Sequence, residues 1–112
     1  MHTAPTEGNP IVHATTAVIT TAAARLTEAG YHVTTRQVPR RGSDTTEPMV
    51  WARNGSKLAT LWGDSDGRVF VSMVIDYGQH GTTFCDGAHL KSAAGIVKRA
   101  SRFLGEPKVV ES

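Results

Sequence analysis

Two histidines flank the single cysteine of the chain, and this is the place where residue types and spacing suggest covalent or metal chemistry. His80 lies five residues before Cys85 and His89 lies four residues after it, with Asp86 next to the cysteine. A cysteine beside an imidazole base is a nucleophile, and Cys85 with both histidines, completed by Asp86 or water, would form a zinc site. We expect Cys85 just before a helix N-terminus, where the helix dipole stabilises a thiolate.

A simpler interpretation explains the same residues. A single cysteine is most often a small buried hydrophobic residue. No third catalytic group and no family signature accompany this one. The sequence therefore predicts a non-enzymatic protein without cofactor or metal, and leaves His80, Cys85 and His89 as the candidates for a thiol or zinc site.

Aromatic and arginine side chains form a second group, within a run of expected strands. One expected sheet face carries five large apolar residues with two arginines at its rim, namely Trp51, Leu58, Trp62, Phe70 and Val74 with Arg53 and Arg68. Three uses fit this group. The tryptophans fill the core, or the face docks on a protein, or the rings stack bases while the arginines hold phosphates.

The last helix-like run carries a basic stripe opposite its apolar residues, formed by Lys91, Lys98 and Arg102 with Arg99 beside them. Such a stripe contacts phosphate in nucleic-acid-binding proteins, and any surface helix also shows one. If the protein binds a nucleic acid, we expect the phosphate contacts to be Arg53, Arg68, Lys91, Lys98 and Arg102.

The strands that position these residues come from two turns within residues 49–77. Asn54-Gly55 between two strand-like runs is a strong hairpin signal, because both residues accept positive φ. A two-residue turn at this place would pair Trp51 with Leu58. Three consecutive antiparallel strands follow from the two turns.

The second turn, within residues 63–67, leaves two registers open. A five-residue loop pairs Trp62 with Arg68 and buries one alternating set, namely Val50, Ala52, Ala59, Leu61, Val69, Val71, Met73 and Ile75. A loop one residue shorter flips the third strand. The core face then carries Trp51, Trp62, Val69, Val71 and Met73. In both registers the second face keeps large apolar side chains, so we expect something to cover it.

Helical spacing of apolar residues brackets these strands. Asn9 followed by Pro10 reads as a helix start, and Gly30 reads as its end. Residues 31–38 are rich in β-branched side chains and predict a first strand, and residues 39–48 predict a mobile loop. The last helix is expected over residues 87–104.

The predicted fold class is α+β, with the order helix, four-stranded antiparallel meander, helix, and with both helices packed on one face of the sheet. Residues 9–105 form a single domain, preceded by a disordered N-terminus at 1–8 and followed by a loose tail at 106–112. This order resembles that of the double-stranded RNA-binding domain. That family has three strands and a lysine-rich start to its last helix, whereas only Lys91 stands near that position here, so no family is assigned.

Composition narrows the function classes. The 112 residues carry a net charge of +2, which permits nucleic-acid binding without arguing for it. One cysteine excludes an internal disulfide, and neither a secretory signal nor an apolar run of the ~20 residues that span a membrane is present. We expect a cytoplasmic protein with no membrane partner.

These observations favour a small binding or accessory module that acts through its second sheet face. The partner is expected to be a protein, either a second copy that forms a homodimer or a different chain. The first alternative is single-stranded nucleic-acid binding through the Trp, Phe and Arg face and the basic last helix. The second alternative is the thiol or zinc site.

Overall fold

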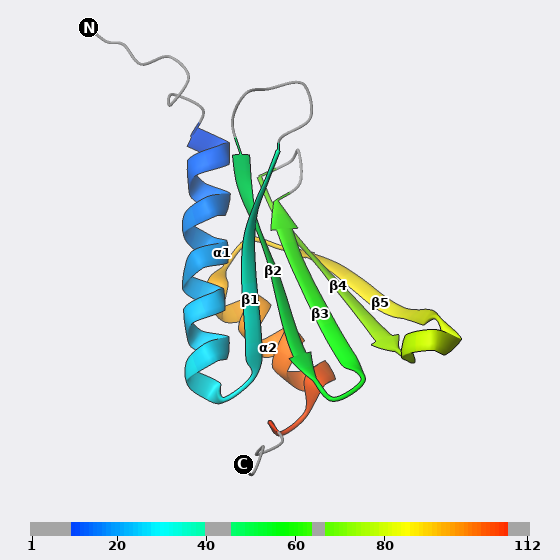
Figure 1. The fold of residues 1–112 in the computed structure, drawn as a ribbon. Coiled ribbons are helices and arrows are strands. Elements are labelled where there is room, and N and C mark those ends of the chain that lie inside the picture. The colour runs from blue at the N-terminus through cyan, green and yellow to red at the C-terminus, as the bar shows by residue number, and fades with distance from the viewer. Residues whose placement is uncertain (1–9, 40–45, 64–66, 108–112) are drawn as a thin grey trace, which may run out of the picture.

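Two helices pack on one face of a five-stranded antiparallel sheet in this computed structural model (Figure 1). The structure describes residues 10–39, 46–63 and 67–107. The elements in chain order are α1 Pro10–Ala29, β1 His32–Pro39, β2 Thr46–Asn54, β3 Lys57–Gly63, β4 Val69–Asp76, a short 3₁₀ helix Gly78–His80, β5 Thr82–Leu90 and α2 Ala93–Leu104. Strand neighbours follow chain order, so the predicted α+β meander between two helices is confirmed, with one strand more than predicted.

Helix α1 has the predicted length, because the residues at its start and just after its end are ones that begin and terminate helices. It begins at Pro10 and ends at Ala29, and Gly30 follows with a φ of +107° that only glycine adopts freely. The backbone N–H of Tyr31 then donates to the carbonyl of Leu26 across this turn. The predicted N-cap, Asn9, lies outside the described residues.

The core fills the space between the helices and every second residue of the inner strands. From the strands it takes Val50, Ala52, Ala59, Leu61, Val69, Val71 and Met73, and from the helices Ile19, Ala22, Leu26, Ile96, Ala100 and Leu104. Because side chains of a strand alternate between faces, the residues between these positions point away from both helices. The burial expected for a five-residue second loop is therefore confirmed, except for Ile75, which is only half-buried.

Both predicted hairpin pairings are wrong by two residues. Trp51 pairs with Thr60 rather than Leu58, and Trp62 pairs with Phe70 rather than Arg68. The first turn is Gly55-Ser56, since Asn54 already pairs with Lys57. A slip of two residues keeps every side chain on its face, which is why the burial was right although the partners were not.

The predicted last helix is wrong over its first six residues. Residues 82–90 form a fifth strand along the free edge of β4, with a bulge opposite Met73 and Val74. Helix α2 starts only after Ser92, whose hydroxyl accepts a 3.0 Å hydrogen bond from the N–H of Gly95. Pairing with this segment satisfies backbone N–H and C=O groups that β4 would otherwise leave without partners. This gain outweighs the preference for a helix that the spacing of Leu90 from the later apolar residues indicated.

The connection predicted as a mobile loop at 39–48 is shorter than expected. Pro39 ends β1 and residues 46–48 begin β2, because the two strands pair as far as Pro39 with Thr46. Residues 40–45, the predicted disordered N-terminus at 1–8 and residues 108–112 of the predicted tail lie outside the described residues. Neither described helix combines the length and apolar character needed to cross a bilayer.

Candidate functional site

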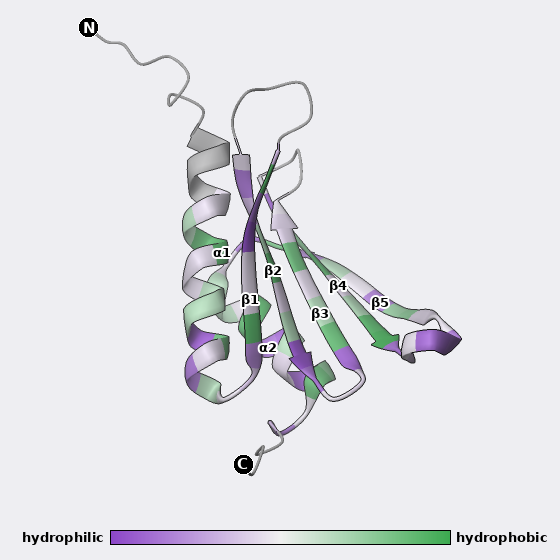
Figure 2. Cartoon of the chain, in the orientation of Figure 1, coloured by the Kyte–Doolittle hydropathy of each residue, from purple (hydrophilic) through white to green (hydrophobic). Residues whose placement is uncertain are grey.

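The face of the sheet opposite the helices, called the outer face here, carries all five residues predicted to bind a partner. Trp51, Leu58, Trp62, Phe70 and Val74 are each half-buried on it. They alternate with core residues along β2, β3 and β4, and both tryptophans therefore point away from the helices. Figure 2 shows hydrophobic stretches on β3 and β4, whereas β1 is mostly neutral to hydrophilic. Neither helix covers this apolar face.

Three rings form a continuous row across the outer face, called the aromatic row. Trp62 pairs with Phe70 across β3 and β4, and Phe70 pairs with His89 across β4 and β5. The ring centroids of Trp62 and Phe70 are 4.7 Å apart with planes tilted by 55°, and those of Phe70 and His89 are 4.7 Å apart with a tilt of 53°. Tilted rings at this spacing attract each other. His89 joins this row because it lies on a strand rather than on the predicted helix.

Gly87 leaves room for the aromatic row beside it on β5. A Cβ at this position would lie 2.8 Å from Cζ of Phe70 and 3.2 Å from Cζ of Phe84. Phe84 is 61% exposed and extends the apolar surface toward the β4–β5 turn. Sequence reasoning missed Phe84, because its strand was read as an irregular connection.

A hollow of about 390 Å³ lies on the outer face beside β1 and is called the edge hollow. Its lining residues are His32, Thr34, Arg36, Trp51, Arg53 and Leu58. Thr34 pairs with Trp51, so the small threonine separates the tryptophan from the edge of the sheet. Sequence reasoning missed His32, Thr34 and Arg36, although their period-two spacing could have placed them on one face of β1.

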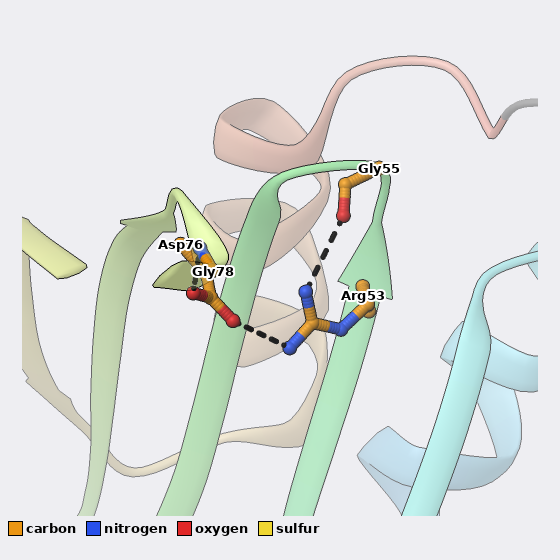
Figure 3. A network of polar contacts seen from close by, with 4 residues as sticks. All are labelled: Arg53, Gly55, Asp76 and Gly78. Carbon is orange, nitrogen blue, oxygen red and sulfur yellow. Dashed lines mark hydrogen bonds and ion pairs between the residues drawn. The ribbon is translucent and has the colours of Figure 1, made fainter. Parts of the chain in front are cut away.

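Arg53 lines this hollow. Its guanidinium is held by a carboxylate (Figure 3). Its Nη2 donates to Oδ2 of Asp76 at 3.0 Å, and its Nη1 lies 3.5 Å from the carbonyl oxygen of Gly55. Oδ1 of Asp76 accepts a 2.9 Å hydrogen bond from the N–H of Gly78. The Gly78 N–H and, next, Arg53 hold the pKa of Asp76 below its ordinary value. The charge of Arg53 is therefore already paired.

The predicted phosphate contacts do not share one surface. Arg68 and Lys91 directly flank the pair Val69 and Leu90, so they lie at the aromatic-row end of the sheet. Lys98 and Arg102 belong to α2, on the opposite side of the sheet from the outer face. A strand of nucleic acid on the outer face would therefore not reach the helix residues.

Arg102 lines a second hollow, of about 330 Å³, between α2 and the sheet. The other lining residues are Met73, Asp86, Arg99 and Phe103. Asp86 accepts hydrogen bonds from the N–H of Gly87 and from Nη2 of Arg99. The Gly87 N–H and then Arg99 lower the pKa of Asp86. This carboxylate is therefore occupied in joining β5 to α2.

The candidate thiol or zinc residues are not brought together. His80 ends the 3₁₀ helix, Cys85 lies exposed at the bulge of β5, and His89 lies four strand residues further on, which corresponds to ~13 Å. Cys85 therefore does not precede a helix N-terminus. Within residues 10–39, 46–63 and 67–107, no three His, Cys, Asp or Glu side chains gather as a metal site would require.

Comparison of the chain with protein-family models, with curated proteins and with solved structures finds no match in any of the three. The outer face and the edge hollow are therefore the features that point to a function.

Proposed function

We propose that this protein is a small, non-enzymatic binding module that docks on protein through the outer face of its sheet. The observation that supports the proposal is the position of Trp51, Trp62 and Phe70, which alternate with the core residues and lie on the face that neither helix covers. Exposed sets of aromatic, aliphatic and arginine side chains are typical of protein interfaces.

The two tryptophans make this face easy to follow, since they are the only ones in the chain. Intrinsic fluorescence therefore reports on the outer face alone. Peptides selected from a displayed random library on the intact protein are expected to shift this emission. Phe70→Ala is expected to weaken those peptides by about tenfold or more, as hot-spot truncations do.

Lys98→Ala provides the matched control, because Lys98 is exposed on α2 across the sheet. Selected peptides are expected to bind this variant as they bind the wild type. Light scattering at micromolar concentration identifies whether the partner is a second copy, in which case Phe70→Ala dissociates the dimer. A protein that stays monomeric and whose selected ligands ignore both Phe70→Ala and Trp51→Ala contradicts the proposal.

Single-stranded nucleic acid is a second candidate partner, and the aromatic row favours it. The row of tilted rings of Trp62, Phe70 and His89 ends beside Arg68 and Lys91, so bases and phosphates would find neighbouring contacts. Oligothymidylate would then quench the emission of Trp62 at low salt, and added salt would reverse the quenching. Absence of quenching at low salt removes this candidate.

A further inference from the structure

Strand β1 offers an open edge of the sheet. It pairs with β2 along all eight of its residues without a register shift and has no strand on its other side. Six of its eight residues are exposed. The opposite edge strand, β5, is interrupted by a bulge, which is a common way to prevent further pairing. Among the described strands, β1 is therefore the edge better suited to accept an added strand.

The edge hollow lies directly behind this open edge. A strand added to β1 would run about 4.8 Å from it, and its outward side chains would face His32, Thr34 and Arg36 in turn. Because Thr34 is small, an apolar side chain opposite it can extend over the threonine to the ring of Trp51. In the added strand, the residues two positions before and two positions after this apolar one would stand opposite His32 and Arg36.

The charges at the β1 edge indicate which kind of strand would bind there. Arg53 is neutralised by Asp76, whereas no carboxylate among the described residues pairs with Arg36. A second copy would bring its own β1, whose outer-face residues His32, Thr34, Arg36 and Val38 offer no carboxylate in any register. A strand with acidic residues flanking an apolar one complements this edge instead.

We propose that β1 and the edge hollow bind an extended acidic segment of another protein by strand addition. The segment has an apolar side chain in the hollow against Trp51 and a carboxylate two residues away that faces Arg36. This inference rests on the proposed function and narrows its partner to an acidic, extended chain. A nucleic acid lacks the backbone groups to extend the sheet, and Lys98 and Arg102 lie beyond its reach across the sheet.

The test uses the full chain carrying Trp62→Phe, so that Trp51 is the single fluorophore. The probe is a synthetic peptide, blocked at both ends, with a central phenylalanine and glutamates two positions to either side. It is titrated to millimolar concentration beside three controls: glutamine in place of the glutamates, a scrambled order, and N-methylation of the central amides. Only the first peptide is expected to saturate the Trp51 signal.

Arg36→Glu tests the charge assignment without relying on loss alone, and the exposure of Arg36 makes this change compatible with the fold. The glutamate peptide is expected to lose roughly tenfold in affinity, and a lysine version of the same peptide is expected to gain a similar factor. Circular dichroism confirms that the variant is folded.

Two results of this titration overturn the inference. One is a Trp51 signal that changes as much with the scrambled peptide as with the glutamate peptide, or a glutamate-peptide affinity that is the same with and without Arg36→Glu. The other is a response to oligothymidylate in place of the peptide, which would assign the hollow to nucleic acid. Library peptides that bind through Phe70 while Trp51 stays silent would leave the proposed function in place and reject only the edge site.

Discussion

The side-chain amide of Asn54 donates a 2.7 Å hydrogen bond to the carbonyl oxygen of Leu104, the last residue of α2. The same amide reaches the carbonyl of Glu106 at 2.8 Å. The first hairpin turn thus satisfies carbonyl groups that a helix C-terminus leaves without partners. Asn54 acts here through its side chain rather than as a turn residue with positive φ.

Replacement of Asn54 by alanine is expected to lower the free energy of unfolding by about 1–3 kcal/mol, because it removes the amide donor from the part-buried hydrogen bond to the carbonyl of Leu104. Urea denaturation followed by far-UV circular dichroism measures this loss. Ser56→Ala, in the same turn and exposed, serves as the control and is expected to change stability by less than about 0.5 kcal/mol. Equal losses in both variants would contradict the bridging role of Asn54.

Substitution at neighbouring residues of β3 distinguishes its two faces. Leu61 is fully buried beneath the helices, so Leu61→Ala is expected to cost about 2–5 kcal/mol of unfolding free energy. Trp62→Ala, next in the chain but half-buried on the outer face, is expected to cost clearly less despite the larger side chain lost. A larger loss of unfolding free energy in Trp62→Ala than in Leu61→Ala, measured by thermal or urea unfolding, would contradict the assignment of the core to the Leu61 face.

A methyl group at Gly87 is expected to disturb the aromatic row. The Cβ of Gly87→Ala would stand 2.8 Å from Cζ of Phe70, whose ring lies between Trp62 and His89. We expect a loss of about 1–3 kcal/mol and a change in the near-UV spectrum of Trp62. In a Phe70→Leu background the clashing ring is gone, so the same change at Gly87 should cost less. A double-mutant cycle without such coupling would argue against the contact.

Acid is expected to weaken the fold through Asp76. The N–H of Gly78 and the guanidinium of Arg53 lower the pKa of Asp76 below its ordinary value of 3.8. A carboxyl with a depressed folded pKa contributes stability that is present above the unfolded pKa and is lost as pH falls through the folded pKa. Unfolding free energy should therefore decline below about pH 4. Asp76→Asn should show a shallower decline, whereas Glu28→Gln, at an exposed site on α1, should follow the wild type.

Cys85 is expected to behave as an ordinary exposed thiol. It lies exposed at the bulge of β5 and belongs to no cluster of three His, Cys, Asp or Glu side chains among the described residues. Its Sγ is 3.7 Å from the carbonyl oxygen of Thr83. The folded protein should react with a thiol reagent as fast as the urea-unfolded chain does, and Cys85→Ser should keep the same stability and peptide binding. Loss of peptide binding in Cys85→Ser, or zinc bound at one equivalent per chain, would instead restore the thiol or zinc hypothesis.

Local signals in the sequence were sufficient for much of the architecture. The end of α1 at Gly30 follows from the conformational freedom of glycine, and the buried set of β2, β3 and β4 follows from alternation of apolar residues. Both depend on neighbours within a few positions. The outer face with Trp51, Leu58, Trp62, Phe70 and Val74 was therefore predictable from the register with a five-residue second loop.

Tertiary structure alone decided the fifth strand, the strand partners and the edge hollow. The segment 82–90 is a strand because β4 offers an open edge that pairs with it, a contribution that no window of the sequence contains. The register slipped by two residues without changing the faces, so burial could not reveal the true partners. Arg36 and Trp51 line the same hollow only because β1 pairs with β2. Alternation of apolar residues does not fix the length of the connection between these two strands. Periodicity reports on one strand at a time, whereas a binding surface is made by several strands lying side by side.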